Sequence, residues 1–132
     1  MTIRFLLLKA VLAITASAQK HTAGYTWKLE ECTGTKSTRE VVCKIDVSSQ
    51  KLAKHSFDVY RNHRVTFDAG KGGLIPSSAN WIERGKGEPE AKIVSRPGEG
   101  FYYFIKFNKV PVVPSGRITF PRSEFDAKIN WQ

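Results

Sequence analysis

Residues 101–107 read Phe-Tyr-Tyr-Phe-Ile-Lys-Phe, and this stretch decides the fold that we expect. Side chains alternate between the two faces of a β-strand. The odd-numbered residues therefore form one apolar face, which we expect to pack in the core, while Tyr102, Phe104 and Lys106 form the other face. That second face combines two aromatic rings with a cation.

Two later stretches repeat this alternation, Gly-Arg-Ile-Thr-Phe at 116–120 and Ala-Lys-Ile-Asn-Trp-Gln at 127–132. We expect the three strands to pair as an antiparallel meander. Such a surface, rich in cations and aromatic rings, can hold a nucleotide or a phosphate, but it lacks a pair of groups for proton transfer. The mixed faces would bring together Tyr102, Phe104, Lys106, Arg117, Thr119, Lys128, Asn130 and Gln132.

This surface supplies five candidate RNA-binding or phosphate-binding residues. Arg117 offers a planar fork to a phosphate, and Lys106 and Lys128 add charge around it. Tyr102 and Phe104 supply rings on which bases can stack. The alternative is that Arg117 pairs with a neighbouring acid and that the aromatic rings fill a shallow groove.

Residues 1–18 carry the features of a secretory signal peptide. Arg4 gives a basic start, residues 5–14 are a short apolar run, and Ala-Ser-Ala at 16–18 is a small-residue cleavage site. We therefore expect a secreted protein, with a single domain over residues 19–132. A membrane anchor is the alternative, but the apolar run is too short to span a bilayer, so we expect no stable membrane insertion.

The chain is strongly basic, with a formal net charge of +9 that falls to about +7 without residues 1–18. A basic excess favours polyanions such as nucleic acid or acidic membrane surfaces as partners, although the charge can also serve solubility alone. Two cysteines and three scattered histidines offer no metal-ligand spacing. We therefore expect neither a metal site nor a cofactor.

Residues 25–32 and 41–47 also alternate between apolar and polar side chains, which predicts a β-hairpin around a polar turn. Cys32 and Cys43 then lie on facing arms, and secretion makes a disulfide between them the default. An amphipathic helix over residues 38–52 is the alternative. It would turn Cys43 away from the apolar side chains around it, so we prefer the hairpin.

One helix is predicted after the hairpin, capped by Ser48 or Ser49 and running through residues 50–62. Its apolar side chains fall on one stripe, formed by Leu52, Ala53, Phe57 and Tyr60.

The remaining middle of the chain predicts mostly loop. Residues 65–67 look extended, residues 69–89 have loop composition with Trp81 and Ile82 as core anchors, and residues 90–95 form a strand. The stretch Gly-Lys-Gly-Gly at 70–73 lacks the glycine spacing and the Lys-Ser/Thr ending of a phosphate-binding loop.

The order of a cysteine-bearing hairpin, a serine-capped helix and an antiparallel sheet resembles the secreted guanyl-specific fungal ribonucleases and the ribonuclease-like effectors of plant-pathogenic fungi. The stretch at 101–107 resembles the family's Pro-Tyr-Tyr-Glu-Trp-Pro-Ile strand, and residues 114–120 resemble its Pro-Gly-x-Asp-Arg-Val-x-Phe strand. The resemblance implies an α+β fold with an N-terminal β-hairpin and one helix packed on a twisted antiparallel sheet.

The same resemblance implies that the catalytic groups are missing. The family's general-base glutamate falls on Phe104, its general-acid histidine falls on Trp131 or Gln132, and its arginine falls on Arg117. A positioned acid or base contributes about 10²–10⁴-fold to such a reaction. No histidine follows His63 in this chain, so we expect no catalytic residue.

The sequence therefore predicts a secreted, monomeric fungal effector with a catalytically degenerate ribonuclease-like fold, which binds a host protein or host RNA. Two alternatives stay open: an RNA-binding module, and an active secreted ribonuclease with relocated catalytic groups. Whether the protein acts outside host cells or is translocated into them is also open.

Overall fold

The computed structural model describes residues 19–22, 25–49, 55–58, 60–61, 63–84, 89–90, 92–95 and 99–132. This part of the chain is all-β and contains no helix. No helix in these ranges is therefore long and apolar enough to cross a membrane. The predicted signal peptide at 1–18 lies outside the described residues.

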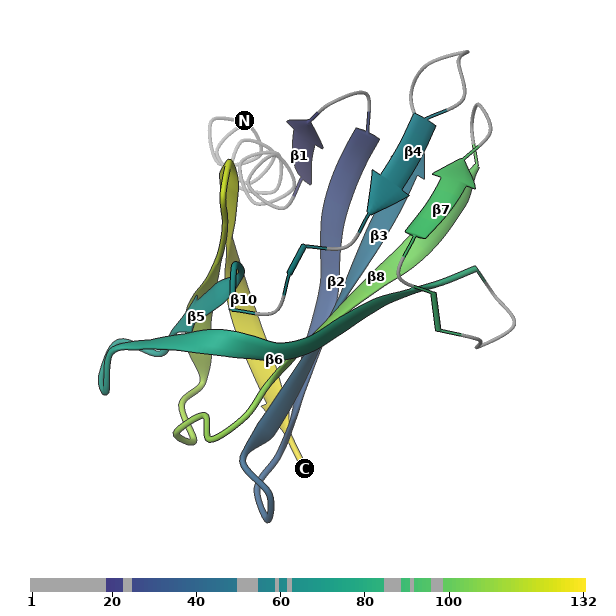
Figure 1. The fold of residues 1–132 in the computed structure, drawn as a ribbon. Helices are drawn as coiled ribbons and strands as arrows, with labels where there is room; N and C mark the ends of the chain where they lie inside the picture. The colour runs from purple at the N-terminus through teal and green to yellow at the C-terminus, as the bar shows by residue number, and fades with distance from the viewer. Residues whose placement is uncertain are drawn as a thin grey trace, which may run out of the picture.

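Seven strands close into a barrel (Figure 1). Their order around the barrel is β2, β10, β9, β5, β6, β8 and β3, and β3 pairs back onto β2. Neighbouring strands are antiparallel except for β10 and β2, which are parallel. The strands are β2 (Tyr25–Thr35), β3 (Glu40–Ser49), β5 (Thr66–Asp68), β6 (Leu74–Glu83), β8 (Gly100–Phe107), β9 (Ser115–Phe120) and β10 (Ser123–Trp131).

Three short strands lie outside this ring. β1 (Gln19–Thr22) extends the sheet along β2, where it pairs with residues 25–28. β4 (His55–Asp58) and β7 (Lys92–Ser95) form a separate two-stranded sheet beside the barrel (Figure 1). The strand predicted at 90–95 is therefore present as β7, although it pairs outside the main sheet.

The core fills the barrel interior, because alternate side chains of each strand point inward. The odd-numbered residues of β8 are all buried, as the sequence predicted. The same alternation buries Val41, Cys43, Ile45 and Val47 on β3. In a barrel of this size the interior is occupied by side chains, so the closed sheet is a packed core and not a channel.

Tyr60 packs against this core from the segment that follows β4. Its ring lies 5.6 Å from that of Phe120, and its backbone N–H donates a 3.0 Å hydrogen bond to the phenol oxygen of Tyr103. The same phenol donates a 2.9 Å hydrogen bond to Oδ1 of Asn80. A buried hydroxyl therefore joins three separate parts of the chain.

The predicted hairpin and its disulfide are confirmed. β2 and β3 pair antiparallel with Cys32 opposite Cys43, and the two residues form a disulfide across 4.0 Å between their Cα atoms. Both cysteines are fully buried in the barrel interior. The alternative helix over residues 38–52 is excluded where the chain is described, because β3 continues to Ser49.

The predicted α+β fold with one helix is wrong. Residues 55–58, at the centre of the expected helix, form strand β4 and pair with β7. Tyr60, which we placed on the apolar stripe of that helix, contacts the barrel core from a segment without regular secondary structure. Residues 50–54 lie outside the described part. The helical spacing of apolar residues indicates only a weak local preference for helix. Pairing with another strand overrides that preference here.

The predicted loop over residues 69–89 is also wrong, because β6 occupies residues 74–83 and pairs with β8. The glycines at 70, 72 and 73 have positive φ angles and form the turn that leads into this strand. Ile82 is buried as expected, but Trp81 lies on the outer face and is not a core anchor. This strand was not predicted because few of its side chains are buried, so its sequence shows no clear alternation of apolar and polar residues.

The expected meander of three C-terminal strands is half right. β9 and β10 pair antiparallel, as predicted. β8 is a neighbour of neither, because it pairs with β3 on one edge and β6 on the other. With no helix in the described residues and a closed ring of strands, the ribonuclease-like architecture over residues 19–132 is not what the chain adopts there.

Candidate functional site

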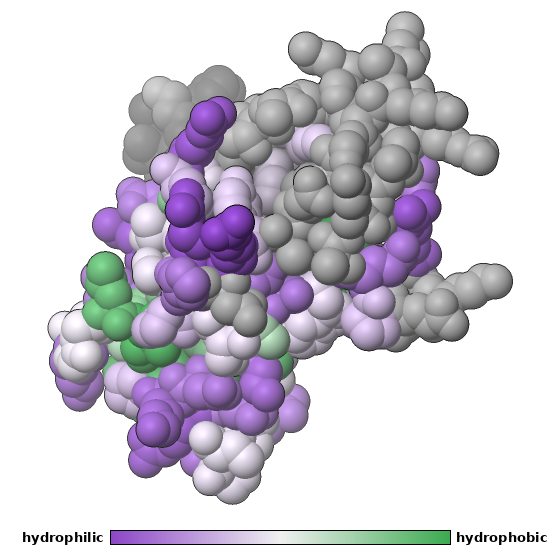
Figure 2. Space-filling model, viewed as in Figure 1, coloured by the Kyte–Doolittle hydropathy of each residue, from purple (hydrophilic) through white to green (hydrophobic). Residues whose placement is uncertain are grey.

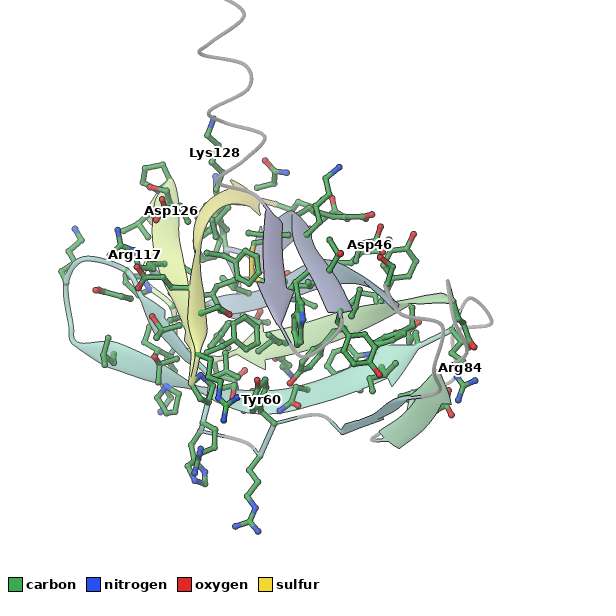
Figure 3. The ribbon with its side chains drawn as sticks, turned by 90° about the horizontal axis from the view of Figure 1, so that it is seen from above. Asp46, Tyr60, Arg84, Arg117, Asp126 and Lys128 are labelled. Carbon is green, nitrogen blue, oxygen red and sulfur yellow. A yellow bond between two sulfur atoms is a disulfide. The ribbon has the colours of Figure 1, made fainter. Side chains whose placement is uncertain are left out.

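The five sequence-predicted binding residues do not share one surface. Tyr102, Phe104 and Lys106 lie on the outer face of β8, whereas Arg117 is on β9 and Lys128 is on β10. Seen from above, Arg117 and Lys128 stand on the opposite side of the barrel from Asp46, which is the β3 partner of Tyr102 (Figure 3). The meander that would have joined these residues is replaced by a closed barrel.

The outer face of β8 forms an aromatic wall with its neighbours β6 and β3. The rings of Phe104 and Trp81, which are paired across β8 and β6, stack at 5.4 Å with 10° between their planes. The ammonium of Lys44 lies 4.1 Å from the ring centre of Tyr102. The ring of Tyr102 in turn lies 6.5 Å from that of Phe104. The three rings, Trp81, Phe104 and Tyr102, are therefore in contact with one another and with a lysine, and all three side chains are half-buried.

Each cation on this wall already faces a carboxylate. Lys106 Nζ lies 3.2 Å from Glu40 Oε1, and Lys44 Nζ lies 3.6 Å from Glu30 Oε2. At the end of β6, Arg84 contacts both Glu90 and Glu99, at 3.3 and 3.2 Å. These pairs cancel the positive charge that a polyanion would need, so the aromatic wall is poorly suited to phosphate binding.

Arg117, on the opposite side of the barrel, is also paired with acidic residues. Its Nε donates a 3.2 Å hydrogen bond to Asp126 Oδ1, and its Nη1 lies 3.9 Å from Glu124. The hydrogen bond to Asp126, followed by the charge of Glu124, raises the pKa of the Arg117 guanidinium. The structure thus shows the pairing with neighbouring acids that the sequence left as the alternative. Lys128 is exposed on the next strand.

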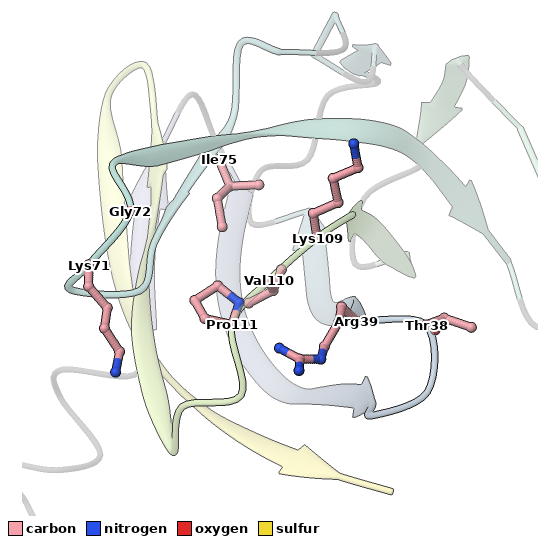
Figure 4. Close-up of a pocket in the computed structure, with 8 residues that line it drawn as sticks. All are labelled: Thr38, Arg39, Lys71, Gly72, Ile75, Lys109, Val110 and Pro111. Carbon is pink, nitrogen blue, oxygen red and sulfur yellow. The ribbon is translucent and has the colours of Figure 1, made fainter.

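A pocket of about 560 Å³ opens at one end of the barrel (Figure 4). Three connections build it: the turn between β2 and β3, the turn between β5 and β6, and the loop between β8 and β9. Figure 4 shows Ile75 pointing from β6 towards Val110 and Pro111, which together form an apolar floor. The described residues that line it are Thr38, Arg39, Lys71, Gly72, Ile75, Lys109, Val110 and Pro111.

Positive charge surrounds the apolar floor of the pocket. Arg39, Lys71 and Lys109 are exposed, and none of them forms an ion pair with any residue that the structure describes. The two nearest acids in sequence are engaged elsewhere: Glu40 pairs with Lys106, and Asp68 accepts a 2.8 Å hydrogen bond from the Gly70 N–H. Among the residues that the structure describes, no carboxylate lines the pocket.

Two of these cations sit on unusual backbone. Arg39 and Lys109 have φ angles of 60° and 56°, in the left-handed region that favours glycine. The Val110 N–H donates a 2.9 Å hydrogen bond to the Arg39 carbonyl, which ties the two segments together. A side chain in this region costs about 1 kcal/mol or more, and such strain concentrates at functional sites. His63 is the third non-glycine residue with a positive φ angle in the described part of the chain, and it does not line the pocket.

The pocket offers binding groups but no acid–base pair. Guanidinium, ammonium and the Thr38 hydroxyl can donate hydrogen bonds to an anion, and a pocket of this volume is in the range of ligand sites. In the described ranges, no group of three or more His, Cys, Asp and Glu side chains could hold a metal ion. The arrangement is therefore suited to holding an anionic group beside an apolar surface.

Sequence reasoning missed all three cations of the pocket. Each stands in a turn-rich stretch, Ser-Thr-Arg-Glu at 37–40, Gly-Lys-Gly-Gly at 70–73 and Asn-Lys-Val-Pro at 108–111. The presence of a cation in each of these three turn-rich stretches is a signal that the sequence could have provided. Its meaning depends on the strand order, however, because only the closed barrel brings these turns to one end.

Comparisons with known proteins place the chain in no family. No family model matches it, and neither a curated protein nor a solved structure matches it.

Proposed function

We propose that this protein acts by binding a polyanionic macromolecule at the cationic end of its barrel, without catalysing a reaction. The observation that carries the proposal is the set of cations at the pocket, Arg39, Lys71 and Lys109, which have no ion pair among the described residues. Lys106 and Arg117 are paired with acids and offer less to a ligand. Other exposed cations without an ion pair among the described residues, such as Lys36 and Lys128, do not line this pocket.

The high net charge, +9 for the full chain and about +7 without residues 1–18, supports a polyanion as the partner, because the field of the whole chain adds to that of the pocket. A secreted effector that binds a host macromolecule, acts as a monomer and needs no cofactor is compatible with this proposal. RNA is the polyanion to test first.

The test is a titration of a labelled single-stranded RNA at several salt concentrations. Each phosphate contact on a single strand contributes about 0.7 to the slope of log K against log salt. We expect Arg39→Ala and Lys109→Ala each to weaken binding and to lower the slope by about that amount. The RNA should be recovered intact, because we expect binding and no cleavage.

Arg117→Ala and Lys106→Ala are matched controls. They remove the same side-chain types and the same charge, but from positions already paired with Asp126 and Glu40. Equal losses in all four variants would mean that net charge alone drives binding. A loss confined to Arg117→Ala would move the site to β9 and β10, and cleavage of the RNA would favour an active ribonuclease.

A further inference from the structure

The two large hydrophobic side chains that stand exposed in the described part of the chain both lie at the pocket end of the barrel. Leu74 is 64% exposed and Val112 is 44% exposed. Each directly adjoins a residue of the pocket floor, Leu74 beside Ile75 and Val112 beside Pro111. In the space-filling view, hydrophobic side chains gather on the left, around the turn between β5 and β6, with hydrophilic residues next to them (Figure 2).

Each of two connections at this end carries a cation and, three residues later, an exposed aliphatic side chain. The turn into β6 carries Lys71 and then Leu74, and the loop after β8 carries Lys109 and then Val112. Arg39 adds a third cation from the neighbouring turn, and Val110 holds that turn to the β8–β9 loop through its backbone. This end of the barrel therefore combines three cations with two exposed aliphatic side chains, Leu74 and Val112, which we call the apolar tips.

This combination discriminates between polyanions. RNA presents phosphates to the cations, but isolated leucine and valine side chains are poor stacking partners for its bases, which prefer aromatic rings. The surface of an anionic bilayer offers both kinds of contact, since phosphates lie next to the boundary of the acyl chains. Exposed apolar tips flanked by lysines match that profile.

We propose that this end of the barrel docks onto the surface of an anionic phospholipid bilayer. Leu74 and Val112 enter the boundary between headgroups and acyl chains, and Arg39, Lys71 and Lys109 face the lipid phosphates. This inference rests on the proposed function, because the same three cations bind, and it names an anionic lipid surface as the partner that the apolar side chains favour. RNA then serves in the test as a polyanion that engages the cations alone. The barrel itself stays outside the hydrocarbon, and the attachment is reversible.

The expected strength follows from few contacts. A lysine or arginine near an anionic surface is worth about fivefold in binding. Full burial of a leucine or valine side chain is worth at least about tenfold, and partial entry gives less. Three cations and two aliphatic tips therefore give measurable but salt-sensitive binding.

The test is co-sedimentation of the full chain with vesicles. One set contains phosphatidylcholine alone, and the other contains phosphatidylcholine and phosphatidylserine at roughly three to one. We expect binding to the second set only, weakened about fivefold by Arg39→Ala or by Lys109→Ala. Changing both tips, Leu74→Ser with Val112→Ser, should lower vesicle binding about tenfold and leave RNA affinity unchanged.

A matched variant keeps the apolar character of both tips, Leu74→Met with Val112→Ile, and should bind vesicles like the unchanged chain. Circular dichroism of each variant checks that the barrel is folded. RNA binding without binding to phosphatidylserine vesicles overturns this inference and leaves the proposed function intact, whereas failure to bind either removes both. Vesicle binding that is unchanged in the variant Leu74→Ser with Val112→Ser also overturns the inference. So does a dimer of the unchanged chain that this double variant alone converts to monomers.

Discussion

The backbone N–H of Tyr60 donates a 3.0 Å hydrogen bond to the phenol oxygen of Tyr103, which lies fully buried inside the barrel. The same phenol donates to Asn80 on β6. One hydroxyl thus links β8, β6 and the segment after β4, which are far apart in the sequence. A buried polar group that is satisfied in this way stabilises one arrangement of these segments over others.

Tyr103→Phe should lower the free energy of unfolding by about 1–3 kcal/mol, because the Tyr60 N–H loses its acceptor in the core. Urea denaturation followed by tryptophan fluorescence measures the change. Tyr102→Phe is the matched control: it removes the same hydroxyl from the adjacent residue, whose side chain lies on the outer face. Equal costs for the two substitutions would contradict the role given to the buried phenol.

Tyr103 should also limit stability at high pH. Burial raises the pKa of the Tyr103 phenol above its ordinary value of 10.0, because the folded barrel disfavours the charged form. The unfolded chain releases this proton near pH 10, so the contribution of Tyr103 is complete below that pH and is lost as the pH rises further.

The measurement is the free energy of unfolding from pH 8 to pH 11, expressed as a slope against pH near its upper end. Tyr103→Phe should make the decline shallower, although the variant is less stable at neutral pH. Tyr102→Phe should keep the slope of the unchanged chain. Identical slopes in all three proteins would assign the alkaline loss to other groups, such as the lysines.

The disulfide between Cys32 and Cys43 should contribute to stability mainly by restricting the unfolded chain. Its sequence separation is 11, and a loop of that size is worth roughly 2–3 kcal/mol. We expect Cys32→Ala with Cys43→Ala to lower the unfolding free energy by at least that amount, since both side chains are also buried. Mass spectrometry of the unreduced protein should find no free thiol.

Gly34 should not tolerate a side chain. A Cβ atom placed there would meet the indole of Trp131, its partner on the parallel strand β10. The indole is held in place by a 2.6 Å hydrogen bond from its Nε1 to the Val113 carbonyl. Gly34→Ala should therefore cost about 1–3 kcal/mol by overpacking.

Thermal unfolding of Gly34→Ala against Gly100→Ala separates overpacking from the general effect of replacing a strand glycine. The nearest atom to a Cβ at Gly100 is the Val47 carbonyl oxygen at 3.7 Å, an ordinary contact. The Gly100 variant should therefore melt close to the unchanged protein. A similar fall in both variants would show that the indole moves aside easily.

Lys109→Gly should separate stability from binding. Glycine adopts the φ of 56° at this position without strain, so the substitution should raise the unfolding free energy by up to about 1 kcal/mol. It should weaken RNA binding, because the ammonium is lost from the pocket. Lys71→Ala, which removes an equal charge from the same pocket, gives the binding loss without the stability gain.

The alternation of apolar side chains determined several elements without help from the rest of the fold. Residues 101–107, 116–120 and 127–131 form strands with the inward faces that the pattern predicted, and the hairpin with Cys32 opposite Cys43 is present. These features are local, since the two-residue period and the facing cysteines depend on near neighbours. These strands and the hairpin are therefore present although the ribonuclease-like fold that we expected around them is not.

The tertiary structure decided how those strands are ordered. β8 pairs with β3 and β6, so the outer faces of Tyr102 and Arg117 lie on opposite sides of a closed barrel. The period of a strand says which residues share a face, but it does not say which strand lies alongside. The segment at 55–58 likewise forms a strand through its pairing with β7, which local preference cannot reveal.

The candidate site is set by the same long-range closure. Arg39, Lys71 and Lys109 lie in three turns that are separated by tens of residues in the sequence, and each turn taken alone predicts nothing beyond a change of chain direction. The sequence by itself determined that the chain is basic, disulfide-linked and rich in alternating strands. Closing the sheet brought the three cations to one end, because strands that run side by side must place their connections at the rims of the barrel.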